Sequence, residues 1–206
     1  MEIDFISKVH SSTKRNYLER VNDKEFPKHK AASLAKKFDF DYWDGDRRIC
    51  YGGYKYIPGR WEAVAVDIIN FYGLNKFSSV LDVGCGKGFL LYEIKKLIPE
   101  IEIRGIDISQ YAIENAKPEI KNYLSIASAK KLPFEDQSFD LVFSINTLHN
   151  LHAYDLYNSL MEIQRVTKSK SYICVESYRN EKEKANLLYW QVTCEAFNTP
   201  EEWLWW

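Results

Sequence analysis

The sequence predicts an α/β protein with a doubly wound, mostly parallel β-sheet, and two observations carry this prediction. Segments with strand and helix patterns alternate from residue 61 onward, which is typical of a parallel sheet with helices on both faces. A glycine-rich turn also joins the first strand to the helix that follows it, as in ligand-binding α/β folds. The predicted elements are strands at 78–83, 101–107, 122–128, 139–145 and 171–176, and helices at 61–72, 88–98, 109–117 and 153–167.

Residues 1–60 follow a different pattern from the rest of the chain. The segment up to about residue 38 is polar and helical in character, whereas residues 39–60 combine turn residues with aromatic side chains that follow no period. A segment of the second kind is typical of an ordered functional loop. We therefore expect an N-terminal helical and aromatic cap at 1–60, packed on a single compact unit at 61–206.

Residues 80–91, VLDVGCGKGFLL, have the pattern of a strand, a turn and the start of a helix. The apolar residues within 80–83 indicate a strand that is buried on both faces. Gly84, Gly86 and Gly88 carry no side chain, so a ligand can approach the backbone there, and the next helix directs its free N–H groups at the same place. The pattern predicts a turn that binds a nucleotide-like ligand.

Two acidic residues indicate which kind of ligand this is. Asp82 stands two residues before a G-x-G-x-G turn, whereas dinucleotide-binding turns have G-x-G-x-x-G and require no acid in the strand. A carboxylate there would repel a pyrophosphate and attract a cationic group. Asp107 ends the next predicted strand, where an acid commonly accepts hydrogen bonds from ribose hydroxyls. Together the two acids favour a nucleoside ligand with a positively charged end.

With these motifs, the segment at about 61–180 resembles the class I S-adenosylmethionine-dependent methyltransferases, of the type 11 and type 25 kind. Three more pieces match in order: Ile108 directly after the ribose acid, SAKKLPF at 128–134, and SFDLVFSINTLHNL at 138–151. The resemblance implies a Rossmann-like sheet, S-adenosylmethionine as cofactor with S-adenosylhomocysteine as product, and transfer of a methyl group by in-line displacement.

The resemblance also implies which residues hold the cofactor. Asp82 would orient the methionine end, Asp107 the ribose and Ile108 the adenine face, although Asp82 could instead cap the glycine turn. An acid commonly stands where this chain has Ser128, so the bond to the adenine amino group would be weaker here. No metal is expected, and the implied cofactor-binding residues are Asp82, Gly84, Cys85, Gly86, Asp107, Ile108, Ser128, Ala129 and Asn146.

The catalytic candidates are His149 and Glu176. His149 is the one imidazole expected at the carboxyl ends of the strands, where ligands bind in open α/β sheets, and it is predicted as a general base. Glu176, at the end of the last predicted strand, is predicted to bind the hydroxyl or amine of the acceptor. The structural alternatives are a histidine that packs at the following helix and a surface acid.

Substrate binding is predicted for Tyr51, Tyr54, Arg60 and Tyr178. The two tyrosines in the cap flank Gly52-Gly53 and can lie on a sulfonium or close over a substrate as a lid, while Arg60 offers a fork for a carboxylate or phosphate. The alternative is a satellite aromatic core that clamps the N-terminal helices on the sheet.

Composition excludes several classes of function. The formal net charge of the 206 residues is −1 and no basic stripe is present, so no nucleic-acid partner is expected. No apolar run is long enough to span a membrane, and the first ten residues lack the apolar core of a secretory signal. The four cysteines are scattered without metal-ligand spacing, which indicates reduced thiols and a cytoplasmic location.

The expected function is methyl transfer to an oxygen or nitrogen of a small-molecule acceptor. The pattern at 51–61 also resembles bacterial members associated with cell-surface sugar modification. The alternatives are a protein methyltransferase, a cofactor-binding protein without turnover, and a dehydrogenase, which the glycine spacing and Asp82 disfavour.

The last residues predict a helix with Thr199 as N-cap and Pro200 at its first position. In the resembled family two more strands follow this helix, and here the sequence stops before them. Either the chain is truncated or this member closes its sheet in another way, and truncation is the favoured interpretation. Loss of the family's C-terminal strands would leave the strand at 171–176 at an edge of the sheet.

Overall fold

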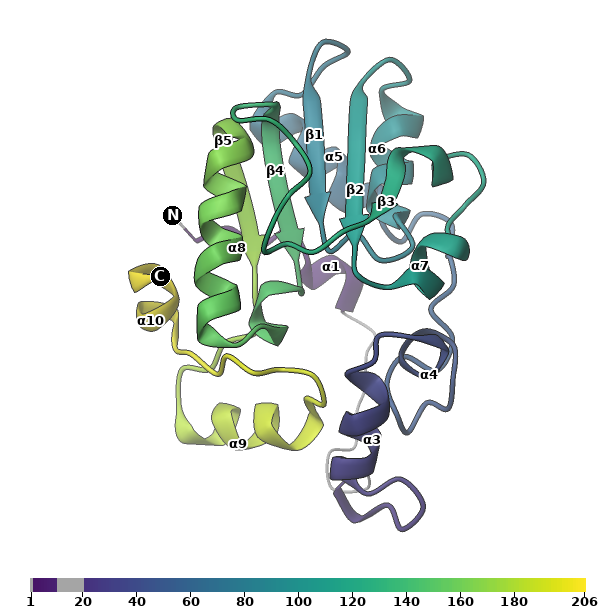
Figure 1. Ribbon diagram of the computed structural model, residues 1–206, viewed down its shortest axis with the longest axis vertical. Helices are drawn as coiled ribbons and strands as arrows, with labels where there is room; N and C mark the ends of the chain where they lie inside the picture. The colour runs from purple at the N-terminus through teal and green to yellow at the C-terminus, as the bar shows by residue number, and fades with distance from the viewer. Residues whose placement is uncertain (1, 11–20) are drawn as a thin grey trace.

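The computed structural model describes residues 2–10 and 21–206, and within them a five-stranded parallel sheet forms the centre (Figure 1). The strands lie in the order β3-β2-β1-β4-β5, so the predicted α/β fold is confirmed. The order reverses between β1 and β4, and ligands of open α/β sheets bind at the carboxyl ends of strands at such a point. The strand bounds are Ser79–Val83 (β1), Glu102–Asp107 (β2), Leu124–Ile126 (β3), Phe139–Ile145 (β4) and Thr167–Cys174 (β5).

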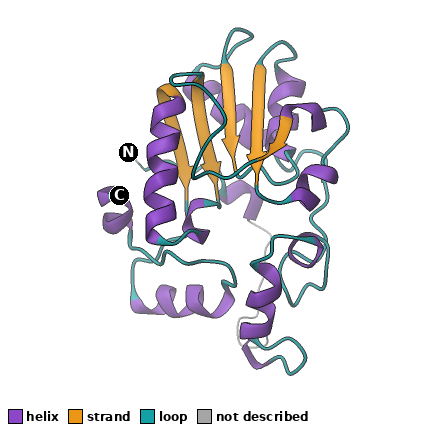
Figure 2. Ribbon diagram, in the orientation of Figure 1, coloured by secondary structure: helices purple, strands orange, loops and turns teal. Residues whose placement is uncertain are grey.

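Helices cover both faces of the sheet (Figure 2). Side chains of a strand alternate between the two faces, so Val80 packs in one hydrophobic cluster and Leu81 in another. The first cluster includes residues of α5 (Glu62–Tyr72) and α6 (Phe89–Leu97), and the second includes residues of α8 (Ala153–Val166). This two-sided cover explains why all of β1 is buried.

The bounds predicted from the sequence agree with α5, β1, α6, β2, β4 and α8 to within one residue. The predicted strand and helix at 122–128 and 109–117 are shorter in the structure, as β3 and as α7 (Gln110–Glu114). A short 3₁₀ helix, η1 (Lys121–Tyr123), takes up the residues before β3, and a second, η2 (Leu148–Asn150), follows β4.

The start of the strand predicted at 171–176 is wrong. β5 begins at Thr167, directly after α8, and its first half is the polar run KSKS at 168–171. These side chains are exposed because β5 is an edge of the sheet in the part of the chain that the structure describes, so the apolar pattern of a buried strand is missing. Lysines on an edge strand also hinder pairing with another chain.

Two helices follow β5. The sequence analysis did not predict α9 (Glu181–Trp190), although Asn180 marks its start by accepting a hydrogen bond from the backbone N–H of Glu183. The predicted C-terminal helix is confirmed as α10 (Pro200–Trp205), and Thr199 forms a reciprocal capping box with Glu202 at its start.

The N-terminal cap lies at the carboxyl ends of the strands, where Figure 1 shows α3 (Lys28–Ala35) and α4 (Phe40–Trp43). The segment around α1 (Ser7–His10) differs, because Phe5, Ile6 and Val9 are buried in the main core with residues of α5. A boundary at residue 60 therefore remains a prediction. Residues 1 and 11–20 of the predicted cap lie outside the described residues.

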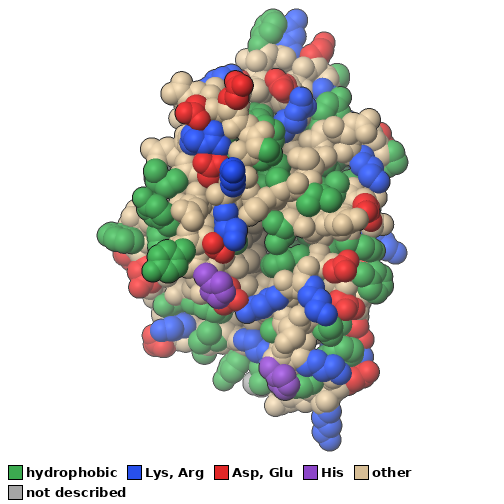
Figure 3. Space-filling model, in the orientation of Figure 1, with side chains coloured by type: hydrophobic (Ala, Val, Ile, Leu, Met, Phe, Trp, Pro, Cys, Tyr) green, Lys and Arg blue, Asp and Glu red, His purple; other side chains and the backbone are tan. Residues whose placement is uncertain are grey.

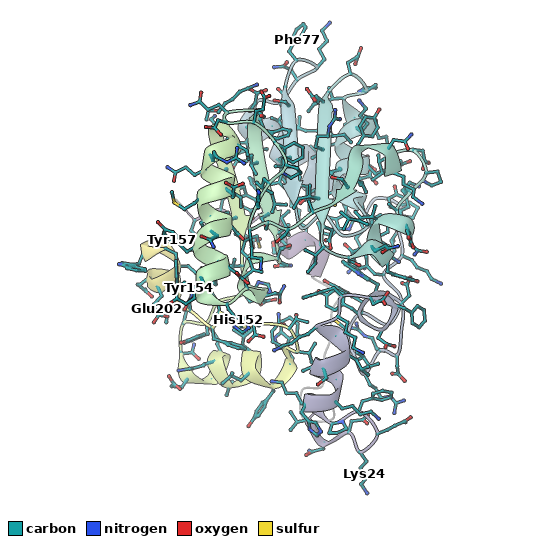
Figure 4. All side chains as sticks on the ribbon, viewed as in Figure 1. Lys24, Phe77, His152, Tyr154, Tyr157 and Glu202 are labelled. Carbon is teal, nitrogen blue, oxygen red and sulfur yellow. The ribbon has the colours of Figure 1, made fainter. Side chains whose placement is uncertain are left out.

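Figure 4 marks the two ends of the molecule. Phe77 is exposed in the loop before β1, at the amino ends of the strands, and Lys24 lies in the cap at the opposite end. Tyr154 and Tyr157 project from the outer face of α8, where both are exposed. The cap and the carboxyl ends of the strands therefore form one end of the molecule together.

A partly buried ion pair joins the cap to the glycine turn. Lys87 is only 4% exposed, and its Nζ donates to Asp44 Oδ2 at 2.7 Å and to the carbonyl of Tyr54 at 2.9 Å. Asp44 also accepts from the Tyr54 backbone and from the Tyr111 hydroxyl. Burial alone would raise the pKa of Asp44, but the hydrogen bonds from Lys87 and Tyr111 lower it below the usual value.

Lys87→Met should lower the free energy of unfolding by about 2–4 kcal/mol, because Asp44 would keep its charge and lose its cation. Urea denaturation followed by tryptophan fluorescence measures the loss. The matched control is Lys8→Met, which breaks an exposed ion pair with Asp67 and should cost about 1 kcal/mol or less. Equal losses in the two variants would contradict an anchoring role for Lys87.

Candidate active site

A cavity of about 540 Å³ is enclosed by the glycine turn, the carboxyl ends of β2 and β4, and the N-terminal cap. All but one of the implied cofactor-binding residues line this cavity, as residues that bind one ligand must. These are Gly84, Cys85, Gly86, Asp107, Ile108, Ser128, Ala129 and Asn146. On the face shown in Figure 3, acidic and basic side chains are interspersed around the centre.

The glycine turn is packed tightly on both sides. Gly84 and Gly86 have positive φ angles of 85° and 54°, which favour glycine. A Cβ on Gly84 would lie 2.1 Å from the Thr147 hydroxyl, and one on Gly86 would lie 2.8 Å from the Trp43 ring. The missing side chains therefore make room for Thr147 and Trp43, while the backbone of both glycines faces the cavity.

Asp107 holds the turn from the neighbouring strand. Its Oδ2 accepts from the Gly86 backbone N–H and its Oδ1 from that of Ser109, both at 2.8 Å. Burial raises the pKa of Asp107, although these backbone hydrogen bonds oppose the rise. Each carboxylate oxygen has a further lone pair, so Asp107 can also accept hydrogen bonds from the hydroxyls of a ligand.

Asp82 is the exception among the implied cofactor residues. It is buried within β1 and does not line the cavity. Burial and the neighbouring Asp107 carboxylate both raise its pKa well above the usual value. A positive charge brought near this pair would favour the ionised carboxylates. The position is therefore compatible with attraction of a cationic ligand end, without direct contact.

The loop after β4 offers an acceptor that the sequence analysis missed. The Asn150 side chain lines the cavity and donates from Nδ2 to the carbonyl of Asn146 at 3.3 Å. Its Oδ1 is buried, and among the described residues it is the one buried side-chain oxygen or nitrogen without a hydrogen-bond partner. A buried acceptor without a donor is costly, so a ligand N–H or O–H is expected to meet it.

The aromatic residues of the cap both pack together and line the cavity. The rings of Trp43 and Tyr51 are stacked with centroids 5.5 Å apart, and Tyr54 stacks on Phe89 at 5.1 Å. Tyr51, Tyr54 and Arg60 all line the cavity. The predicted substrate residues of the cap are thus brought to one cavity. Tyr51 and Tyr54 also pack in the satellite aromatic core that was the alternative prediction, whereas Arg60 is exposed.

His149, Glu176 and Tyr178 do not line this cavity. His149 is 2% exposed, and its Nδ1 accepts from the Glu176 backbone N–H at 3.2 Å. Burial lowers its pKa to about 4, and its carbonyl accepts from the backbone of Glu195 and Ala196. His149 and Glu176 line a separate cavity of about 60 Å³. His149 is a packed histidine, although its hydrogen bonds are not with the following helix, and Glu176 is half-buried and so is not a surface acid. The geometry lends the two catalytic predictions no support, and they stay predictions.

Tyr178 is also placed away from the predicted substrate site. It is buried, and Lys184 Nζ lies 5.2 Å from its ring centroid.

In the described residues no helix has both the length and the apolar character needed to cross a bilayer. Among the same residues, no group of three or more His, Cys, Asp or Glu side chains could hold a metal ion.

The strand order, the glycine turn and the acid that ends β2 define an α/β domain that binds a nucleoside cofactor at the carboxyl ends of its strands. A family model described as a methyltransferase domain matches residues 74–205. The chain therefore belongs to this methyltransferase family, whose methyl donor is S-adenosylmethionine, and the resemblance noted from the motifs is confirmed.

Individual relatives match parts of the chain. An uncharacterized methyltransferase of Schizosaccharomyces pombe is 32% identical over 113 residues, which are 49% of this chain and 40% of the relative. The ubiquinone/menaquinone biosynthesis C-methyltransferase UbiE of Citrifermentans bemidjiense is 32% identical over 127 residues, or 58% and 52% of the two chains. This chain thus spans about half the length of these curated relatives, or less.

The solved structure of the YcgJ protein from Bacillus subtilis is similar in fold. It superimposes with a TM-score of 0.57 at 20% sequence identity, over 68% of this chain and 64% of that one. At 20% sequence identity, this similarity shows a shared fold and nothing about activity.

The buried, uncharged state of His149 makes stability depend on pH. Its pKa of about 4 lies below the 6.5 of an ordinary imidazole, so between these values the unfolded chain binds a proton that the folded chain does not. Acidification through this window therefore destabilises the fold. In His149→Gln, the loss of unfolding free energy from pH 7 to pH 5 should be smaller than in the wild type by about 2 kcal/mol.

Urea denaturation at the two pH values measures this difference, and His152→Gln, which changes an exposed neighbour, is the control. If His149→Gln kept the wild-type pH dependence and lost only turnover, the structural role would be refuted and the catalytic prediction restored.

Proposed function

We propose that this chain transfers the methyl group of S-adenosylmethionine to an oxygen or nitrogen of a small-molecule acceptor. The proposal rests on one observation: the glycine turn, Asp107 and the residues implied to bind adenine all line the cavity of about 540 Å³. Family membership supports methyl transfer in general. The acceptor class rests on the cavity, whose 540 Å³ lies within the range of small-molecule sites of ~300–1,000 Å³.

The residues present fit the cofactor. Asp107 offers acceptor lone pairs for ribose hydroxyls, and Asn150 Oδ1 is a buried acceptor that still needs a donor. Ile108 and Ala129 line the cavity with apolar surface. Ser128 Oγ accepts from the Lys130 backbone at 3.3 Å and has a second lone pair that can accept from the adenine amino group. When bound, S-adenosylmethionine supplies a methyl group on a sulfonium, which is a good leaving group.

The chain contributes mainly alignment and exclusion of water. Packing fixes the glycine turn between Thr147 and Trp43, so its backbone presents one geometry to a ligand. The rings of Trp43, Tyr51 and Tyr54 cover the cavity from the cap side and replace water with apolar surface. Displacement reactions gain much of their rate from such positioning in a dry site, so the absence of His149 from the cavity is compatible with the proposed activity.

Asp107→Asn should weaken binding of S-adenosylhomocysteine by about 10- to 100-fold, because a charged acceptor for the ribose is lost. The amide also presents N–H groups toward a backbone donor, so the turn itself is disturbed. Titration calorimetry measures the affinity. Asp155→Asn is the matched control, because Asp155 lines the same cavity but pairs with Lys130.

Wild-type protein should also bind S-adenosylhomocysteine more tightly than a nicotinamide dinucleotide. The reverse order of affinities would refute the proposed function. An unchanged affinity in Asp107→Asn would mean that the ribose binds elsewhere.

A further inference from the structure

The cavity is lined by arginines that pair with no carboxylate of the described residues. Six arginines lie in the described residues, and four of them form ion pairs: Arg48, Arg104, Arg165 and Arg179. The two described arginines without a carboxylate partner are Arg47 and Arg60, and both line the cavity. The net charge of the chain is −1, yet both of these unpaired guanidinium groups belong to residues that line the same cavity.

Both guanidinium groups are anchored by backbone carbonyls. Arg47 Nη1 donates to the carbonyls of Cys50 and Tyr51 at 3.0 and 2.7 Å, and Arg60 Nη2 donates to that of Val9 at 3.2 Å. A carbonyl orients a guanidinium without cancelling its charge, and the remaining N–H groups stay available. The fork of an arginine matches the two oxygens of a carboxylate or phosphate.

The loop is built around Arg47. Gly52 has a φ of +66°, and a Cβ there would lie 2.6 Å from Arg47 Cα and 2.7 Å from its Cδ. Only a glycine lets the arginine side chain cross the loop at this point. The position of Arg47 is therefore determined by packing as well as by hydrogen bonds.

The other charged groups of the cavity do not cancel these charges. Lys55 lines the same cavity, is exposed and forms no ion pair with a described residue. Of the lining carboxylates, Asp107 is tied to the glycine turn and Asp155 pairs with Lys130. The N-terminal part of the chain thus contributes basic side chains to the cavity together with the aromatic rings of Tyr51 and Trp61.

We propose that Arg47 and Arg60, with Lys55, form an anion subsite that binds a carboxylate or phosphate group of the methyl acceptor. The acceptor class is then a small anionic molecule whose apolar or ring portion packs on the cap aromatics. This inference rests on the proposed function. The α-carboxylate of the cofactor presents the same chemistry, so the experiment must separate the two sources of negative charge.

The probes are phenyl phosphate and phenol, titrated by calorimetry into protein saturated with S-adenosylhomocysteine. Phenyl phosphate should bind at least 10-fold more tightly than phenol. Arg47→Gln and Arg60→Gln should each weaken phenyl phosphate binding by about 3- to 10-fold and change the S-adenosylhomocysteine affinity less than 2-fold. Arg104→Gln removes an equal charge outside the cavity and is the matched control.

Arg47→Lys tests whether a loss of binding comes from the lost charge or from damage to the loop. It keeps the positive charge but lacks the paired N–H donors of the guanidinium group. It should bind phenyl phosphate with an affinity between those of wild type and Arg47→Gln. Melting temperatures close to that of Arg104→Gln show that the variants are folded.

Four outcomes overturn the inference. Equal binding of phenyl phosphate and phenol, or equal binding by Arg104→Gln and the two cavity variants, means that no anion subsite exists. A 10-fold loss of S-adenosylhomocysteine affinity, with affinity for 5′-methylthioadenosine unchanged, assigns the arginines to the carboxylate of the cofactor. Failure of the wild type to bind S-adenosylhomocysteine refutes the proposed function itself, before any acceptor probe is added, and the inference falls with it.

Discussion

The hydrogen bonds that Asp107 accepts are the constraint on which the rest of the site depends. One carboxylate oxygen binds the Gly86 backbone and the other binds the Ser109 backbone, so the ends of β1 and β2 become a single rigid edge. The cap is positioned on that edge, because Trp43 packs on Gly86 and donates from Nε1 to the Ser109 hydroxyl at 2.9 Å. The carboxylate that is predicted to bind the ribose therefore also determines where the cap can lie.

The fold from residue 61 onward could be predicted because its central strands are buried on both faces and its helices carry apolar residues at regular spacing. The cofactor side of the site could be predicted for a related reason, since its residues follow strand ends in short motifs. The exceptions are informative. β5 was misplaced because an exposed edge strand needs no apolar residues, and Asp82 lies inside β1, where the motif alone does not show which way the side chain faces.

The contacts of His149 and of Lys87 could not be predicted, because they join residues far apart in the sequence. His149 meets the backbone of Glu176, 27 positions later, and Lys87 meets Asp44, 43 positions earlier. No periodicity in the sequence records such partners. The same reasoning applies to Asn150, whose unpaired Oδ1 is recognised only when the surrounding donors are known to be absent from the described structure.

The two sides of the cavity are built from different chemical groups. The sheet side offers backbone and a carboxylate at fixed strand ends, so a change there disturbs the core together with the cofactor site. On the cap side, the aromatic rings also hold the cap in place, and their truncation would alter stability and binding at once. Arg60 and Lys55 are exposed residues that form no ion pair with a described residue. Charge on the cap side is therefore the property that can vary most freely without loss of the fold, and acceptor specificity is expected to depend on it.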